Sequence, residues 1–270
     1  MGGSREGAAR PAGVASRILA SGPFRDRFYF QNPLHRENIE QAIEGLGDLS
    51  RATVLDYGCG ARVLTTDLLA RASSRVVAVD ADFQALRLLR ERLPPETRGR
   101  VLAVVSDAHA LALVAESVDA VFGLGVLHHL DLARAVPALA RVMRPGSRGA
   151  FVEPLGHNPF LRLFRLLTPG MRERDEHPLL MRDLRAMAGS FTRFDHHESQ
   201  LFSLGALALR ALPWVGERLY RLSIRPLAAA DRILLKRIPW LRRHTWTTVI
   251  TLTRGAGAGT PPEVRSPDRS

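Results

Sequence analysis

The 270-residue chain has 46% apolar and 24% charged residues. That is ordinary globular composition and excludes a wholly disordered chain. A single cysteine, Cys59, excludes an intrachain disulfide framework and a multi-cysteine metal cage. No uncharged run approaches the about 20 apolar residues of a membrane-spanning helix. We therefore expect a cytoplasmic protein without a metal site.

Positive charge is unevenly spread along the chain. The formal net charge is +11, and residues 154–254 carry 17 basic and 8 acidic side chains. Such a local excess favours an anionic partner, such as a phosphate-bearing substrate, an anionic membrane or nucleic acid. A solvated surface of an arginine-rich protein is the alternative, and the pattern alone leaves both open.

Between residues 52 and 153, short apolar runs alternate with segments of helical spacing. βαβ units of this kind predict a Rossmann-like α/β fold, doubly wound, with a mostly parallel sheet and helices on both faces. The pattern predicts strands at 52–56, 75–80, 101–105, 118–122 and 148–153, and helices at 63–72, 83–93 and 132–142. A turn is expected at Pro145-Gly146.

The pattern changes after Pro154. A helix at 179–187 and strands at 192–197 and 245–253 complete a seven-stranded sheet. A basic helical insertion, about 203–241, precedes the last strand. Its bases at 218, 221, 225, 232 and 236 would align on one helical face, but Pro226 argues against a continuous helix. Flexible tails are expected at 1–16 and 255–270, which leaves one domain at 17–254.

The densest motif is Val54-Leu55-Asp56-Tyr57-Gly58-Cys59-Gly60. A predicted strand ends in an acid and opens into a glycine turn before a helix. Glycines let the backbone approach a ligand, and the helix presents free N–H groups. Asp80 ends the second strand, where an acid can hold a ribose diol, and Asp107 follows the third strand. Helix capping is the alternative role for Asp80 and Asp107.

Two nucleotide-binding interpretations compete for this loop. A dinucleotide motif has a third glycine where this chain has Val63. Asp56 would also repel a pyrophosphate, whereas it suits a cationic amino group. An NAD(P)-dependent Rossmann oxidoreductase is therefore the alternative to a protein that binds a cationic nucleoside.

The glycine loop and Asp80 are followed in order by Ser106-Asp107-Ala108 and by the segments 117–122, 126–130 and 141–146. Together they resemble the class I S-adenosylmethionine-dependent methyltransferases of the small-molecule type. The resemblance covers about residues 52–153 and implies a methyltransferase that uses S-adenosyl-L-methionine. It departs from the family pattern at Arg62, where a third glycine often stands, and a side chain there would narrow the pocket or point outward.

The resemblance also implies roles for individual residues. Asp56, Gly58 and Gly60 would line the methionine end of the cofactor. Asp80 would hold the ribose, with Ala81 beside the adenine. Asp107 and Ala108 would meet the adenine ring, and Gly123 and Leu124 would border the sulfonium. A helix that closes over the cofactor is expected at Phe28-Tyr29-Phe30 and His35.

The methyl acceptor is expected to be a small or lipid-like molecule. His157 and His128 are the candidate catalytic bases, because the pKa of histidine lies near neutrality; simple packing is the alternative. The basic insertion is interpreted as a substrate cap, a packed helix or a contact with an anionic membrane surface. Nucleic acid is not expected as a partner. A catalytically silent binding protein with this fold is a further alternative.

Overall fold

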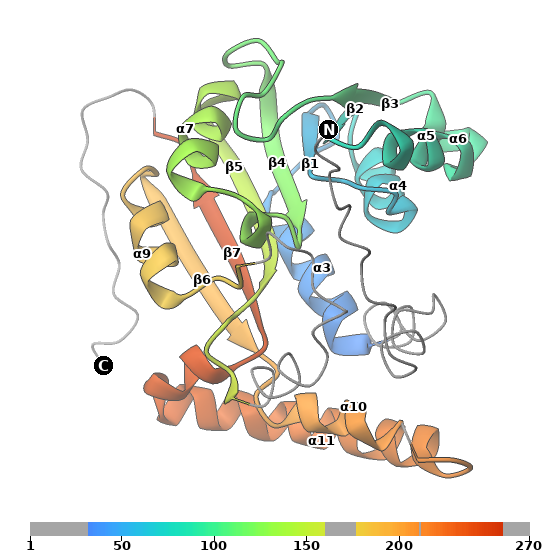
Figure 1. Ribbon diagram of the computed structural model, residues 1–270, viewed down its shortest axis with the longest axis vertical. Coiled ribbons are helices and arrows are strands. Elements are labelled where there is room, and N and C mark those ends of the chain that lie inside the picture. The colour runs from blue at the N-terminus through green and yellow to red at the C-terminus, as the bar shows by residue number, and fades with distance from the viewer. Residues whose placement is uncertain (1–31, 160–176, 211, 256–270) are drawn as a thin grey trace, which may run out of the picture.

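A computed structural model describes residues 32–159, 177–210 and 212–255. Its sheet has the strand order β3-β2-β1-β4-β5-β7-β6, in which β7 runs antiparallel to both neighbours (Figure 1). The predicted seven-stranded, mostly parallel fold is thus confirmed. The strands are β1 (Thr53–Tyr57), β2 (Arg75–Asp80), β3 (Val101–Val105), β4 (Val118–Leu124), β5 (Met143–Pro154), β6 (Arg193–Ser199) and β7 (Thr247–Thr253).

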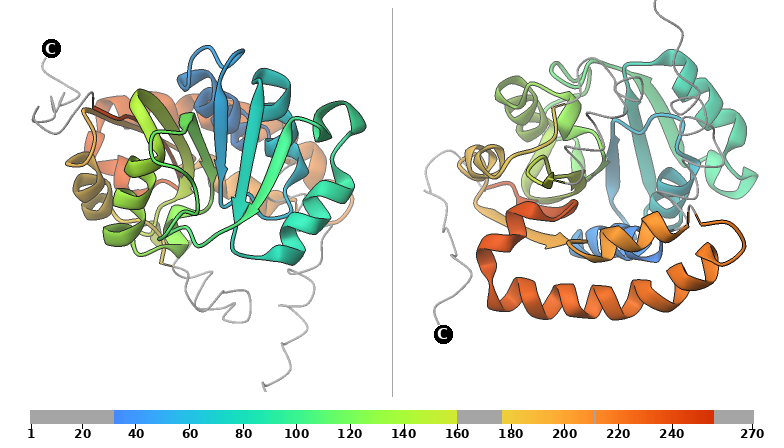
Figure 2. Two further views of the ribbon diagram at one scale, coloured as in Figure 1. Left: turned by 90° about the horizontal axis from the view of Figure 1, so that it is seen from above. Right: turned by 60° about the horizontal axis from the view of Figure 1, so that its bottom comes forward.

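Helices cover both faces of the sheet (Figure 2). One hydrophobic core joins the sheet to α3, α4 and α5, and a second joins the opposite face to α7 and α9. The helices are α3 (Pro33–Gly45), α4 (Val63–Ala72), α5 (Phe83–Arg92), α6 (Pro95–Arg98), α7 (Leu132–Val142), α9 (Met181–Ala188), α10 (Ala206–Leu209) and α11 (Gly216–Arg237), with 3-10 turns η2 (Leu127–His129), η4 (Ser203–Gly205) and η5 (Pro239–His244).

Aspartate caps fix where two of the core helices begin. The Asp82 carboxylate accepts the backbone N–H of Gln84 at the start of α5, and Asp131 accepts that of Ala133 at the start of α7. Such caps satisfy donors that a helix leaves unpaired in its first turn. The polypeptide therefore turns from strand to helix at fixed points along the edge of the sheet.

The turn expected at Pro145-Gly146 is an irregularity inside β5. Val118 pairs with Met143, whereas Ala120 pairs with Arg148, so three extra residues bulge out of β5 between these pairs. Gly146 has a φ of 79° at this point. The strand therefore resumes after the bulge and carries its carboxyl end to Pro154.

The expectation that Pro226 interrupts the basic insertion is wrong, because α11 continues through it as one helix of 22 residues. Proline removes one backbone donor from a helix interior. Burial of Tyr220, Ile224 and Ala228 in a third apolar core offsets that loss. Figure 2 shows α11 lying along the bottom of the molecule, beneath the sheet. The insertion at about 203–241 therefore corresponds to η4, α10, α11 and η5.

Several expectations lie outside the described residues: the tail at 1–16, Phe28-Tyr29-Phe30, and nearly all of the tail at 255–270. Within the described ranges, no helix combines the length and apolarity that crossing a bilayer requires.

Candidate functional site

The glycine loop between β1 and α4 has the backbone shape that requires glycine. Gly58 and Gly60 have φ values of 65° and 55°. A Cβ at Gly58 would lie 2.3 Å from Cγ2 of Val126, so any side chain there would collide with the segment after β4. The Cys59 N–H donates to the carbonyl of Val79. The loop is therefore held against both neighbouring strands, with its backbone turned toward the carboxyl edge of the sheet.

Asp80 is tied to this loop. Its Oδ2 accepts the Gly60 N–H at 2.7 Å, and its Oδ1 accepts the Asp82 N–H at 2.9 Å. Asp82, not Asp80, caps α5, so the alternative role of Asp80 as a helix cap is wrong. A carboxylate offers about four acceptor positions. Asp80 therefore keeps capacity to accept two further hydroxyl groups at the edge of the loop.

Asp56 is buried at the end of β1 and accepts the Thr66 hydroxyl at 2.6 Å. Burial raises the pKa of its carboxyl to about 6, while Thr66 and the Arg62 charge pull it the other way. The Asp80 charge adds to the increase. A buried carboxylate favours a cationic group beside it.

Arg62 folds back over the glycine loop. Its Nη2 donates to the Gly58 carbonyl at 3.1 Å, and its Nη1 lies 3.7 Å from the position that a Cβ on Gly125 would occupy. The Arg62 side chain therefore does not point outward but lies against the loop. The guanidinium places a positive charge where the loop carbonyls and Asp56 provide a negative environment.

Cys59 is the least accessible member of the loop side chains. It is 2% exposed. Burial raises the pKa of its thiol, and the charges of Asp56 and Asp80 add to the increase. A thiol in such surroundings stays protonated and unreactive.

The loop after β3 supplies Asp107 and Ala108. The Tyr57 hydroxyl donates to the Ala108 carbonyl at 2.8 Å, which ties this loop to the end of β1. Asp107 Oδ1 accepts the His109 N–H and pairs with His109 Nδ1, both at 2.8 Å. These hydrogen bonds lower the pKa of Asp107. The carboxylate thus stabilises its own turn, and because no helix begins there, the alternative role of Asp107 as a helix cap is wrong. Its role toward an adenine ring stays a prediction.

Three further predicted residues differ in their surroundings. Ala81 is exposed next to Asp80. Gly123 lies inside β4, and a Cβ there would lie 2.5 Å from the Phe151 ring, so packing alone demands a glycine. Leu124 is buried at the end of β4. Their roles toward a cofactor stay predictions.

A buried carboxylate, Glu153, organises the end of β4. Its Oε1 accepts the N–H groups of Val126 and Leu127, both at 2.8 Å, and its Oε2 pairs with His128 Nδ1 at 2.8 Å. A hydrogen bond to one ring nitrogen of histidine fixes the tautomer and leaves the other nitrogen as the proton acceptor. The His128 ring also adjoins Gly125, whose hypothetical Cβ would lie 3.5 Å from Cε1.

His157 lies apart from this arrangement. Its Nε2 accepts the Met181 N–H at 3.4 Å, and its carbonyl pairs with His244 Nδ1 at 3.1 Å. Partial burial, with His244 and Arg243 nearby, lowers its pKa. The structure therefore places His128 in the segment after β4, beside Gly125 and Glu153, and places His157 beside α9 and η5.

Glu153 and Arg62 also belong to this arrangement, next to the residues that the sequence predicts. Glu153 ends the fifth strand, next to β4 in the sheet, and an acid at that point was its only signal. His35, expected in a closing helix, is buried in α3, where burial and the Arg62 charge lower its pKa to about 4.

This arrangement of strands, glycine loop and strand-end acids defines a class I methyltransferase fold. A solved structure of similar shape is geranyl diphosphate C-methyltransferase from Streptomyces coelicolor, with a TM-score of 0.58 and 15% identity, over 91% of this chain and 90% of that one. Residues 55–151 match the family model described as a methyltransferase domain. Residues 55–151 are therefore similar to a methyltransferase domain, and the fold around them is that of the solved methyltransferase.

Relatives of known sequence carry similar names. An uncharacterized methyltransferase of Mycobacterium tuberculosis is 41% identical over 108 residues, which cover 40% of this chain and 42% of that protein. The demethylmenaquinone methyltransferase of Thermobifida fusca is 31% identical over 162 residues, or 59% of this chain and 62% of that protein. The chain thus spans less than two thirds of the length of either relative.

Proposed function

We propose that this protein transfers a methyl group from S-adenosyl-L-methionine to a small or lipid-like acceptor. The observation that carries the proposal is the hydrogen bond from the Gly60 N–H to Asp80 at the carboxyl edge of the sheet. Both residues lie within the range that matches a methyltransferase domain. A relative named for demethylmenaquinone supports an acceptor with lipid character.

The residues of the loop fit this cofactor. Asp80 would accept the ribose hydroxyls through its remaining lone pairs, and buried Asp56 would lie near the amino group. Asp107, Ala108 and Ala81 would border the adenine, and Gly123 and Leu124 the sulfonium. When bound, the cofactor supplies an activated methyl group on a sulfonium. The chain supplies alignment and a site that excludes water.

An acceptor that arrives protonated needs a base. His128 is the better placed of the two predicted histidines, because Glu153 holds its Nδ1 and its ring adjoins the loop after β4. Nε2 is then the atom that takes the proton from the acceptor. His157, with its lowered pKa, would act from the rim near α9.

A methyl-transfer assay tests the proposal. The purified protein is incubated with methyl-labelled cofactor and, in separate reactions, with a lipid extract or a water-soluble extract. We expect labelled product in the lipid extract, identified by mass, and none with the Asp80→Ala variant. Calorimetry with S-adenosylhomocysteine and with NAD separates the alternatives, because an oxidoreductase would bind NAD. A silent binding protein would bind S-adenosylhomocysteine and label neither extract.

We also propose that the protein works at an anionic membrane surface through α11. The side of this helix that points away from the protein carries Leu219, Leu222 and Ile233, all exposed. We call these three residues the outer stripe. Beside the outer stripe lies a basic flank. At 100° per residue around the helix axis, it covers about 60° and consists of Arg218, Arg221, Arg225, Arg232 and Lys236.

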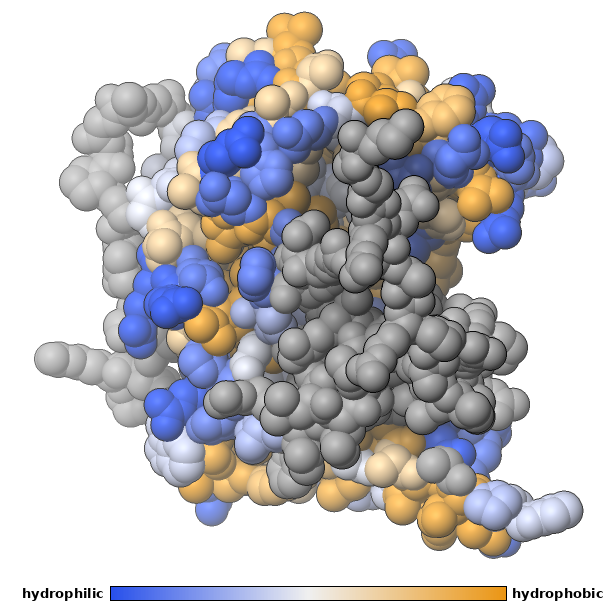
Figure 3. Space-filling model, in the orientation of Figure 1, coloured by the Kyte–Doolittle hydropathy of each residue, from blue (hydrophilic) through white to orange (hydrophobic). Residues whose placement is uncertain are grey.

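The loop between α10 and α11 adds exposed apolar residues to this surface. Trp214 is fully exposed and has a φ of 68°. Its neighbours Leu212 and Val215 are also exposed. Figure 3 shows hydrophobic residues along the lower rim, over α10 and α11, beside hydrophilic ones. Tryptophan and leucine next to arginine are typical of helices that lie in a membrane interface.

Flotation with phosphatidylglycerol vesicles tests the membrane contact. Each basic residue near an anionic surface contributes about 1 kcal/mol, so binding is expected at low salt and weakened at high salt. Combined Trp214→Ser and Leu222→Ser should reduce it about tenfold or more, because buried apolar area is lost. Val114→Ser, an exposed residue on another loop, is the control. Equal binding to neutral phosphatidylcholine would contradict the proposal.

A further inference from the structure

A cavity lies at the β6 edge of the sheet, away from the glycine loop that follows β1. It has a volume of about 630 Å³ and is enclosed by α3, β6 and α11. Strands β4, β5 and β7 separate β6 from β1, so at about 4.8 Å per strand β1 and β6 are roughly 19 Å apart. The cavity has the size of an ordinary small-molecule pocket.

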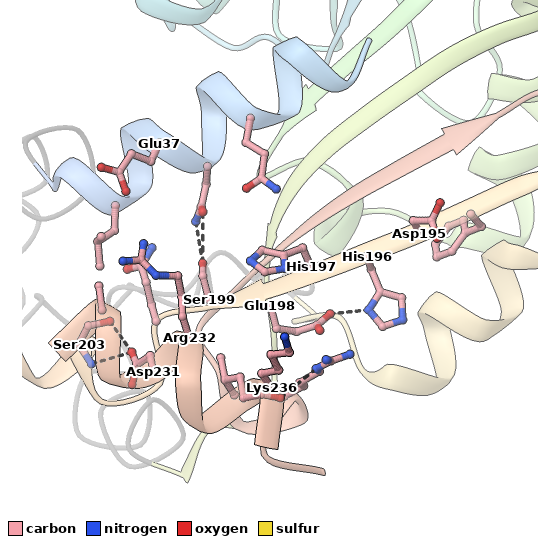
Figure 4. Close-up of a pocket in the computed structure, with 18 residues that line it drawn as sticks. Glu37, Asp195, His196, His197, Glu198, Ser199, Ser203, Asp231, Arg232 and Lys236 are labelled. Carbon is pink, nitrogen blue, oxygen red and sulfur yellow. Dashed lines mark hydrogen bonds and ion pairs between the residues drawn. The ribbon is translucent and has the colours of Figure 1, made fainter. Parts of the chain in front are cut away.

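Side-chain hydrogen bonds fix the walls of this cavity. Asp231 of α11 accepts the N–H groups of Leu201, Phe202 and Ser203 and the Ser203 hydroxyl, at 2.7–3.0 Å. On the other wall, Asn38 of α3 donates to the Ser199 hydroxyl at 2.9 Å. Figure 4 shows both contacts at the margin of the cavity. The walls are therefore preorganised by the protein itself.

Two of the lining residues each have a buried side-chain atom with unmet hydrogen-bonding capacity. Glu198 is 3% exposed, and its Oε1 is engaged with His196 and Thr248. Its Oε2 has no hydrogen-bond partner among the described residues, and neither has Nε2 of Gln200. A buried polar group left unpaired is destabilising. Glu198 Oε2 can accept a hydrogen bond from a donor, and Gln200 Nε2 can donate one to an acceptor.

Positive charge faces the same cavity. Arg232 and Lys236, one turn apart on α11, reach toward β6 (Figure 4). Neither forms an ion pair with a residue in the described ranges. Arg242 also belongs to the lining. Four acids line the cavity as well. Glu37 pairs with Arg225, Asp231 accepts four hydrogen bonds, Asp195 is exposed on β6, and Glu198 is the buried acid described above.

We propose that this cavity is a second ligand site, which takes a small phosphate ester that carries hydroxyl or ammonium groups. Arg232, Lys236 and Arg242 would hold the phosphate, since a doubly charged anion suits several cationic donors. Gln200 Nε2 would donate to an ester or phosphate oxygen. Glu198 Oε2 would accept a hydroxyl or ammonium hydrogen. A free phosphate ester and a lipid headgroup share this chemistry.

Calorimetric titration of the full chain with glycerol 3-phosphate tests the site, with glycerol as the uncharged control. We expect one-to-one binding of the phosphate ester only. Glu198→Gln and Lys236→Ala should each weaken it about tenfold, which corresponds to about 1.4 kcal/mol. Arg237→Ala is the matched control, because Arg237 lies next to Lys236 on α11 outside the cavity lining. S-adenosylhomocysteine binding and thermal unfolding report whether each variant is folded.

Phosphatidylglycerol vesicles form the second arm. Vesicle binding that Glu198→Gln weakens and Val114→Ser leaves unchanged, without binding of glycerol 3-phosphate, assigns the site to a lipid headgroup. The proposal is overturned if the folded protein binds neither probe. It is also overturned if Glu198→Gln binds as the unaltered protein does, or if Arg237→Ala loses as much affinity as Lys236→Ala.

Discussion

The glycine loop and the end of the molecule that contains α11 are built in different ways. At the glycine loop, the key residues lie within a few positions of strand ends, and Gly60 meets Asp80 across 20 residues of chain. At the α11 end, Asn32 bonds to Gln200 across 168 residues, and Asn38 to Ser199 across 161. The first end depends on local motifs that recur between proteins, whereas the second depends on contacts particular to this chain.

The largest expected effect is on S-adenosylhomocysteine affinity, which should fall in an Asp80 variant and not in a variant of its neighbour Asp82. Asp80→Ala removes the carboxylate proposed to hold the ribose, and hydrogen bonds to charged groups contribute about 1.5–3 kcal/mol each. We expect S-adenosylhomocysteine affinity to fall about 100-fold, measured by calorimetry. Asp82→Ala removes only a helix cap, about 1 kcal/mol of stability. Similar affinity losses in both variants would contradict the assignment.

The next effect tests the α11 end alone. Asp231→Ala leaves three backbone N–H groups without their acceptor. We expect the free energy of unfolding to drop by about 3 kcal/mol in urea titration, with S-adenosylhomocysteine binding retained. Asp195→Ala, an exposed acid on β6, should change it by about 0.5 kcal/mol or less. Loss of nucleotide binding in Asp231→Ala would show that the two ends are coupled.

A pH titration sharpens the picture of the glycine loop. The pKa of Asp56 is raised to about 6, so its carboxylate is charged at pH 7.5 and becomes neutral as pH falls through 6. Affinity for S-adenosylhomocysteine, which carries an ammonium group, should therefore fall by up to about tenfold per pH unit below 6. Asp56→Asn should bind weakly with a flat profile between pH 7.5 and 5. A flat profile in the unaltered protein would contradict the assigned role.

The smallest effect concerns Arg62. Its guanidinium bonds to the Gly58 carbonyl and lies near Gly125, in the region assigned to the cationic part of the cofactor. Arg62→Gly should tighten S-adenosylhomocysteine binding by about threefold, because one charge repulsion disappears. Weaker binding in this variant would mean that the guanidinium instead grips the carboxylate of the ligand.

The sequence predicted the sheet, its order of elements and the loop acids, because hydrophobic period and strand-end position determine these features locally. It did not predict the continuity of α11, since Tyr220 and Ile224 offset Pro226 only through packing against distant segments. Neither Asp231 nor the Glu198 cavity had a sequence signal, because each depends on residues brought together by the fold. Whether His157 acts in catalysis remains a prediction.

The Cys59 thiol can report on opening of the glycine loop. The chain contains a single thiol, and that thiol is enclosed by the same backbone that would cradle a nucleoside. An alkylating reagent can modify it only during moments when the loop separates from β2. The rate of labelling in the unmodified protein thus measures loop opening directly, without an engineered probe.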